Sequence, residues 1–155
     1  MNNFEKQNSF RLVLPAMSVN ESFSRSIISG FISRLDPTVE ELCDIKTAVS
    51  EAVTNCIVHA YGKDYPDSKR IIYISGSWNL ENGLITVKIR DKGCGIPDVK
   101  KAMEPLYTTG NDDRSGMGFT IMESFTDKLT VKSTIGKGTT VTLKKYIGKQ
   151  SENSN

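Results

Sequence analysis

Apolar residues recur along the chain at two spacings, and each spacing predicts one kind of element. In residues 9–17, SFRLVLPAM, apolar residues alternate with polar or smaller ones, which predicts a strand that ends at Pro15. In residues 20–35 the apolar residues lie three and four apart, which predicts an amphipathic helix with Asn20 as its cap. The apolar face of this helix contains Phe23, Ile27, Ile28, Phe31, Ile32 and Leu35.

A second helix is predicted over residues 37–60, because Asp36 is a favourable N-cap and Pro37 is a favourable first helical residue. Two strands are expected after it, at residues 70–78 and 84–91, joined by the loop NLENG. The apolar face of the second helix contains Val39, Leu42, Ile45, Val49, Val53, Cys56, Ile57 and Ala60.

The last predicted elements are a short helix in GMGFTIMESF, residues 116–125, and a hairpin over residues 127–146 that turns at IGKG. This order of elements predicts an α+β fold, a two-layer sandwich with the helices packed on one face of a mixed, mainly antiparallel sheet. We expect one domain over residues 1–146 and a disordered polar tail over residues 147–155.

Composition narrows the classes of function. The 20 basic and 18 acidic residues give a net charge of +2, and the basic residues are scattered along the chain, which argues against nucleic acid as a direct partner. Cys43, Cys56 and Cys94 are odd in number and have no C-x-x-C spacing, so neither a disulfide framework nor a zinc site is expected. No apolar run is long enough for a membrane span or a signal peptide, so we expect a cytoplasmic protein without a membrane partner.

One candidate for chemistry lies in the second predicted helix, where Glu51 and Asn55 are one turn apart beside the apolar face. An amide oxygen can bind Mg²⁺, and a carboxylate can accept a proton. A solvated Glu and Asn at the rim of the helix is the alternative, and it is the commoner case for such a pair taken alone.

A second candidate is Asp91, which shares its strand face with Ile85, Val87 and Ile89. A buried carboxylate requires a hydrogen-bond donor, and an amino group on an aromatic base would serve. Gly93 and Gly95 would then let the backbone approach a flat ligand. The alternative is a tight turn with a capping Asp.

A third candidate is RSGMGFTIMESF, residues 114–125, where glycines open an apolar helix. The free N–H groups of a helix N-terminus bind anions, and Arg114 could add a phosphate contact. A glycine-rich turn into a core helix is the alternative. Taken together, a base reader, a phosphate site, a metal-binding amide and a proton acceptor indicate an ATP site that uses Mg²⁺.

The segments EAVTNCIVHAY, DKGCGIP and GMGF resemble the N box and the two glycine boxes of the GHKL ATPases and kinases, which share the Bergerat nucleotide fold. GTTVTL resembles the closing strand of that fold, and the resemblance runs from about Asn20 to Leu143. Within this family NESFSR, LDPTVEEL, IKTAVSEAVTN and PLYTT are similar to segments of anti-sigma factors of endospore-forming bacteria that are also serine kinases.

The resemblance implies a role for each matching residue. It makes Glu51 the general base, Asn55 the Mg²⁺ ligand and Asp91 the adenine reader, and it places Glu21 and Arg25 in contact with protein partners. The other nucleotide contacts that it implies are Gly93, Gly95 and Thr139 near adenine, Thr108 and Thr109 in an ATP lid, and Arg114, Ser115, Gly116, Met117, Gly118 and Phe119 at the phosphates and the helix entrance.

The function implied by the resemblance is that of a homodimeric anti-sigma factor and protein serine kinase. Such a protein binds ATP and Mg²⁺, releases ADP, sequesters a sporulation sigma factor of RNA polymerase (sigma F) and phosphorylates a serine of an anti-anti-sigma protein. An ATP-gated binding module without phosphotransfer is the alternative. The catalytic domain of a histidine kinase is disfavoured, because the chain has no room for a phospho-acceptor hairpin and its only histidine, His59, lies in the nucleotide-binding helix.

Overall fold

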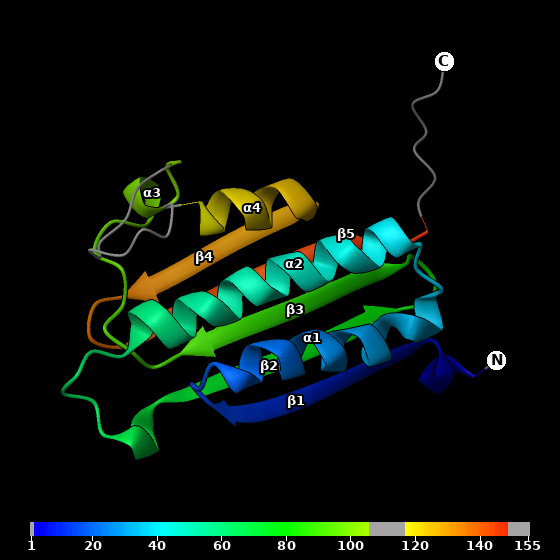
Figure 1. Cartoon of the computed structure of the whole chain (residues 1–155). Helices are drawn as coiled ribbons and strands as arrows, with labels where there is room; N and C mark the ends of the chain where they lie inside the picture. The colour runs from blue at the N-terminus through cyan, green and yellow to red at the C-terminus, as the bar shows by residue number, and fades with distance from the viewer. Residues whose placement is uncertain (1, 106–116, 149–155) are drawn as a thin grey trace.

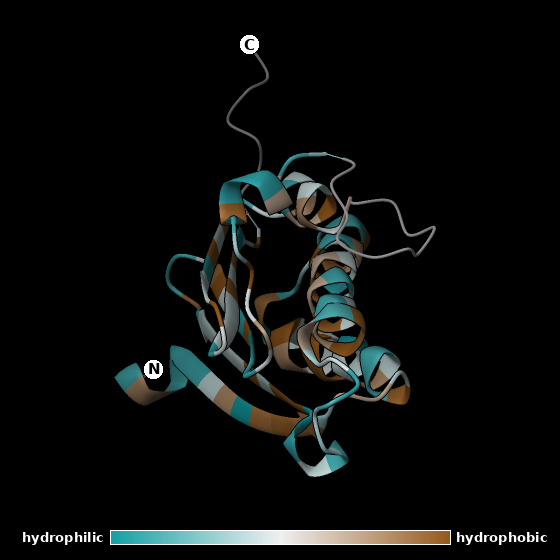
Figure 2. Ribbon diagram, turned by 90° about the vertical axis from the view of Figure 1, so that its left-hand side faces the viewer, coloured by the Kyte–Doolittle hydropathy of each residue, from teal (hydrophilic) through white to brown (hydrophobic). Residues whose placement is uncertain are grey.

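The computed structural model describes residues 2–105 and 117–148 and has two layers (Figure 1). One layer is a five-stranded sheet in the order β1-β2-β3-β5-β4, in which every neighbouring pair is antiparallel. The long helices lie together on one face of this sheet (Figure 2). The predicted α+β sandwich is therefore confirmed. The strands are β1 Gln7–Pro15, β2 Ile71–Asn79, β3 Leu84–Asp91, β4 Lys128–Thr134 and β5 Gly138–Tyr146, and the helices are α1 Val19–Ile32, α2 Val39–Asn55, α3 Val99–Ala102 and α4 Gly118–Phe125.

Alternation within the strands separates the buried face of the sheet from the open one. In β3 the side chains of Ile85, Val87 and Ile89 are at most 1% exposed and face the helices, whereas the alternate residues Lys88 and Arg90 are exposed. Side chains that alternate in this way point to opposite faces of a strand. The described helices lack a segment long and apolar enough to cross a membrane.

Helix α1 packs on the sheet through Ile28 and Ile32, which are fully buried. The indole N–H of Trp78 in β2 donates to the carbonyl oxygen of Phe31 at 3.0 Å and so fixes the end of the helix on the sheet. Two expectations for α1 are wrong. The helix starts at Val19, and the Asn20 side chain donates to the carbonyl oxygen of Pro15 at 2.8 Å instead of capping it. Phe23 is 43% exposed, because it lies outside the buried stripe.

Helix α2 starts at a different cap from the predicted one. The N–H of Glu41 donates to Thr38 Oγ1 at 3.1 Å, and the N–H of Thr38 donates to Glu41 Oε2 at 2.9 Å. This reciprocal pair is a capping box. The predicted cap, Asp36, instead has a left-handed backbone (φ 51°) that ends a 3-10 turn over Ser33–Leu35. Val39 is 79% exposed and does not belong to the apolar face.

We expect Thr38→Ala to lower the free energy of unfolding by about 1 kcal/mol, because it removes the side chain that accepts from an otherwise unpaired N–H. Urea unfolding followed by circular dichroism measures the loss. Val39→Ala, one residue away and exposed, is the control and should change stability by less than about 0.5 kcal/mol. Equal losses in the two variants would contradict the position of the cap.

Candidate nucleotide site

Three segments meet the C-terminal end of α2. They are the loop after β3, the hairpin of β4 and β5, and the first turn of α4. The N–H of Cys94 in the loop donates to the carbonyl oxygen of Ala60 at 2.8 Å, and the N–H of Gly136 in the hairpin donates to the carbonyl oxygen of Cys94 at 2.8 Å. The backbone therefore fixes the loop between the end of the helix and the hairpin.

Asp91 lies at the centre of this junction and is 7% exposed. Its Oδ1 accepts from the N–H of Gly93 at 2.9 Å and from the N–H of Thr139 at 3.3 Å, and its Oδ2 lies 3.7 Å from the thiol of Cys56. The burial expected for this carboxylate is confirmed, and main-chain N–H groups of the protein supply the donors that it requires.

Burial also shifts the pKa values of the two titratable groups that meet at this junction, the Asp91 carboxyl and the Cys56 thiol. It raises the pKa of the Asp91 carboxyl above its usual value, while the hydrogen bonds to Asp91 and the charge of Arg90 act in the opposite direction. Burial raises the pKa of the Cys56 thiol still more, and the neighbouring Asp91 charge adds to that increase. The thiol therefore stays protonated and can donate to the carboxylate.

The glycines after Asp91 are required by the protein's own backbone. A Cβ at position 93 would lie 2.0 Å from the carbonyl oxygen of Ala60. Gly95 has a φ of +77°, and a Cβ there would lie 2.3 Å from the carbonyl oxygen of Thr134. The sequence suggested that these glycines admit a flat ligand. The structure accounts for both by close packing of main chain against main chain.

Helix α2 ends in a feature that the periodicity did not predict. A π-helical turn over Cys56–Ala60 follows the regular α-helix, where one continuous helix was expected. Single π-helical turns are rare and occur frequently at functional sites. The turn contains both Cys56, beside Asp91, and Ala60, against Gly93. Tyr61 follows it, and its hydroxyl donates to the carbonyl oxygen of Ile71 at 2.5 Å and accepts from the N–H of Lys92 at 3.0 Å.

Glu51 and Asn55 converge on the first residue of α4. A Cβ built on Gly118 would lie 3.4 Å from both Glu51 Oε2 and Asn55 Oδ1, so both side chains border the N-terminal end of α4. Asn55 directly precedes Cys56, which places this pair next to the Asp91 cluster along α2. The pair expected from the helical spacing is therefore brought to the predicted helix entrance.

The oxygen atoms of Glu51 and Asn55 suit a hard cation that would be held mainly by the phosphates of a nucleotide. An amide oxygen and a carboxylate suit Mg²⁺, which in nucleotide sites keeps few protein ligands and binds substrate phosphates. Across residues 2–105 and 117–148 there is no group of three or more His, Cys, Asp or Glu side chains that would form a cage made by protein alone.

Some of the other predicted nucleotide contacts lie among the described residues, and the rest lie outside them. Thr139 joins the Asp91 cluster, and its hydroxyl lies 2.8 Å from that of Ser133. Met117 stands at the N-cap of α4, and Phe119 packs against the core from its first turn. The predicted contacts Thr108, Thr109, Arg114, Ser115 and Gly116 lie outside the described residues, as do residues 149–155 of the predicted tail.

The predicted partner residues form an ordered pair on α1. Arg25 Nη2 donates to Glu21 Oε2 at 3.3 Å, and Arg25 Nε lies 2.9 Å from Glu21 Oε1 without an aligned N–H. The hydroxyl of Ser50 in α2 also donates to Glu21. Since Ser50 directly precedes Glu51, the α1 pair contacts α2 beside the proposed catalytic residue.

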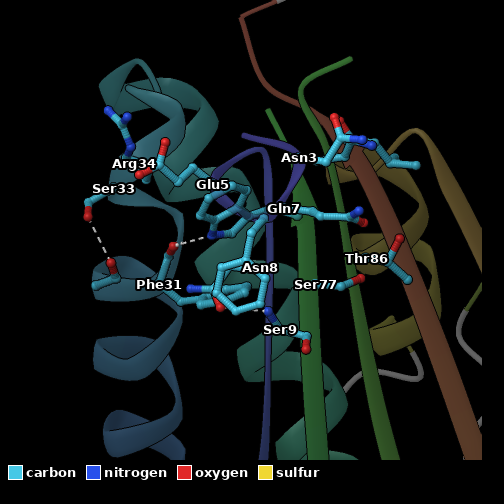
Figure 3. Close-up of a pocket in the computed structure, with 15 residues that line it drawn as sticks. Asn3, Glu5, Gln7, Asn8, Ser9, Phe31, Ser33, Arg34, Ser77 and Thr86 are labelled. Carbon is cyan, nitrogen blue, oxygen red and sulfur yellow. Dashed lines mark hydrogen bonds between the residues drawn. The ribbon is translucent and has the colours of Figure 1, made fainter. Parts of the chain in front are cut away.

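A separate open groove lies at the other end of the sheet (Figure 3). It is bordered by the start of β1, the end of α1 and the neighbouring parts of β2 and β3, with Gln7, Phe31 and Thr86 among its lining residues. Among the described residues, none of the predicted site residues lines this groove. It therefore contributes nothing to the nucleotide site.

Comparison with known proteins identifies the family of the chain. Residues 17–145 match the model of the histidine kinase-like ATPase domain. A protein of Caldanaerobacter subterraneus named anti-sigma F factor is 51% identical over 146 residues, which cover 94% of this chain and 98% of that protein. An anti-sigma F factor of Geobacillus kaustophilus is 49% identical over 144 residues, which cover 92% of this chain and 95% of that protein.

Solved structures share the fold at low sequence identity. A structure of the RsbU and RsbW domains of a Mycobacterium tuberculosis protein has a TM-score of 0.66 and 16% identity, covering 96% of this chain and 35% of that one. A chain of the Pseudomonas aeruginosa SiaB–SiaC complex has a TM-score of 0.64 and 10% identity, covering 87% of this chain and 88% of that one. The resemblance to the GHKL proteins and to bacterial anti-sigma factors is confirmed, and the chain belongs to the histidine kinase-like ATPase domain family.

Proposed function

We propose that the chain is an anti-sigma factor that is also a protein serine kinase, using ATP with Mg²⁺ and releasing ADP. The observation that supports this most directly is the convergence of Glu51 and Asn55 on the N-terminal end of α4, next to the buried carboxylate of Asp91. The relatives about half identical to the chain and named anti-sigma F factor support the same function.

In this proposal Asp91 recognises the base of the nucleotide. Oδ1 already accepts two main-chain N–H groups, whereas Oδ2 has only the Cys56 thiol as a partner, at 3.7 Å, so in this proposal Oδ2 also accepts from the amino group of adenine. Thr139, Gly93 and Gly95 surround that end of the site. The phosphates bind at the N-terminal end of α4, where N–H groups without helical partners attract anions. The residues proposed to assist there are Thr108, Thr109, Arg114, Ser115, Gly116, Met117, Gly118 and Phe119.

Glu51 acts as the general base. Its carboxylate accepts the proton of a substrate serine while the serine oxygen bonds to the γ-phosphorus and the bond from that phosphorus to the bridging oxygen of ADP breaks. Asn55 would hold Mg²⁺, which when bound supplies charge neutralisation at the phosphates. The aligned N–H groups of α4 stabilise the charge that develops on the transferred group.

The partners follow from the relatives and from α1. We propose that Glu21 and Arg25 bind a sigma factor of the F type and, in its place, the anti-anti-sigma protein whose serine is phosphorylated. Two ligands that use one surface oppose each other through a coupling free energy. We further propose that the protein acts as a cytoplasmic homodimer.

Glu51→Gln tests the catalytic step. Because the amide cannot accept the serine proton, we expect phosphotransfer to fall by about 10²- to 10⁴-fold while nucleotide still binds. The assay is incubation with labelled ATP and the candidate anti-anti-sigma protein, followed by mass spectrometry for phosphoserine. Glu123→Gln, an exposed residue of α4, is the matched control and should retain activity. If the wild type binds ATP and forms no phosphoserine, the protein is an ATP-gated binder instead of a kinase.

Asp91→Asn distinguishes the role of Asp91 in nucleotide binding from its effect on the stability of the fold. Since burial raises the pKa of Asp91, the folded state holds this proton more tightly than the unfolded chain does. Ionised Asp91 therefore lowers stability above its folded pKa, and this penalty shrinks as pH falls from there towards the unfolded value. We expect Asp91→Asn to lose nucleotide binding yet to unfold at higher urea than the nucleotide-free wild type at neutral pH, with the difference vanishing in acid. A less stable variant at neutral pH would refute this account.

Arg25→Ala tests the partner surface. We expect sigma-factor affinity to fall about tenfold, as for a contact worth about 1.4 kcal/mol, and ATP affinity to stay unchanged. Isothermal titration with each ligand measures both. Arg34→Ala, an exposed arginine just after α1, serves as the control and should bind the sigma factor normally. Parallel loss of sigma factor and ATP in Arg25→Ala would mean that the variant is misfolded or that the surface is wrongly assigned.

A further inference from the structure

The open face of the sheet has charges of one sign only. Six side chains that point away from the helices are basic, and five of them are exposed while that of Lys144 is half-buried. They are Arg11 in β1, Lys88 and Arg90 in β3, Lys128 and Lys132 in β4, and Lys144 in β5. The single acidic residue within the five strands, Asp91, points to the helix layer. We call these six residues the basic face.

The basic residues are close enough for their potentials to add. Lys128 and Lys144 are directly opposite each other on neighbouring strands, about 5 Å apart at their backbones. Arg11 and Lys88 both pair with Ser75, from the strands on either side of β2. Their backbones are therefore two strand spacings, or about 10 Å, apart. That distance is about one Debye length at moderate salt. In the part of the chain that the structure describes, none of the six forms an ion pair.

The directly opposed lysines make the arrangement unfavourable by itself. Like charges opposite each other in a sheet destabilise it, and a bound anion would relieve the repulsion. Hydroxyl groups lie between the basic residues on the same face, from Ser75, Thr86, Thr140 and Thr142. Lysine, arginine, serine and threonine side chains are the groups that bind phosphate oxygens in nucleic-acid complexes.

We propose that the basic face binds the phosphate backbone of duplex DNA without reading its sequence. The two aromatic residues on this face, Tyr73 and Tyr146, are separated by about 20 Å along the strands, so they cannot stack consecutive bases of a single strand. The ring of Tyr73 is in addition covered by the amine of Lys92, 4.9 Å from its centroid. Contact with phosphates, and not with bases, is what this chemistry provides.

The layout favours a duplex over other polyanions. The basic residues lie on four of the five strands and span the sheet from β1 to β4, about 19 Å across. Along the strands they occupy three registers. A duplex presents two rows of phosphates on either side of a groove about 12 Å wide, whereas a single strand presents one row. The basic residues looked scattered in the sequence, and the fold gathers them on one face.

The test is fluorescence anisotropy of a short labelled DNA duplex of arbitrary sequence over a series of salt concentrations. We expect weak binding in which the logarithm of the affinity falls by about 0.9 per phosphate contact for each tenfold increase in salt concentration. In Lys88→Gln/Lys144→Gln the slope should become shallower by about 2, and the affinity at low salt should fall by about 50-fold. Lys63→Gln/Lys100→Gln makes the same change in net charge outside the sheet, at exposed positions, and should bind like the wild type.

Four results would overturn the proposal. They are no binding by the wild type at low salt, equal loss in the two double variants, tighter binding to a single strand than to the duplex, and tighter binding to poly-glutamate than to the duplex at matched charge. The last result would assign the face to an acidic protein. Thermal melting of each variant excludes misfolding, and if Lys88→Gln/Lys144→Gln melts early, Arg11→Gln/Lys132→Gln replaces it as the face variant.

Discussion

The buried carboxylate of Asp91 is the constraint on which the site end of the molecule depends. An ionised carboxylate in a nearly closed interior is costly unless donors surround it, and here they come from three different elements. Gly93 belongs to the loop after β3, Thr139 to β5 and Cys56 to the π-helical turn that follows α2. Satisfying one charge therefore brings the loop, the closing hairpin and the long helix together, and glycine at 93 is what lets the backbones come so close.

Helix α2 connects the functional regions in sequence order. Ser50 contacts the Glu21–Arg25 pair of α1, Glu51 and Asn55 border α4, and Cys56 contacts Asp91. These contacts lie within about two turns of one helix and the π-helical turn that continues it. Under the proposed function, the nucleotide and the protein partner would therefore bind to neighbouring parts of the same helix.

Sequence patterns predicted those features that depend on periodicity alone. The strand parity that buries Ile85, Val87 and Ile89 also places Asp91 inside, and helical spacing correctly joined Glu51 to Asn55. Features that depend on tertiary contacts were missed. Nothing local in EAVTNCIVHAY marks the π-helical turn, and the reason for glycine at 93 is a carbonyl oxygen distant in sequence.

Cap chemistry explains the error at the start of α2. Both Asp36 and Thr38 are good caps by residue type, and the choice between them depended on Glu41, three residues after Thr38, which completes the box. Pro37 favours a boundary at the residue before it, whereas Glu41, which is visible in the sequence, favours Thr38. Periodicity alone could not have excluded Val39 from the core, since its spacing fits the apolar stripe.

The order of strands has a consequence for synthesis. Strands β2 and β3 follow each other in the chain and pair locally, but β1 pairs with β2 across all of α1 and α2. Pairings between distant segments pay a large loop-closure entropy and form late. The first third of the chain therefore leaves the ribosome with residues such as Phe10 and Ile28 uncovered, a natural target for chaperones. Helix α1, with Glu21 and Arg25, reaches its final setting only after β2 has been made.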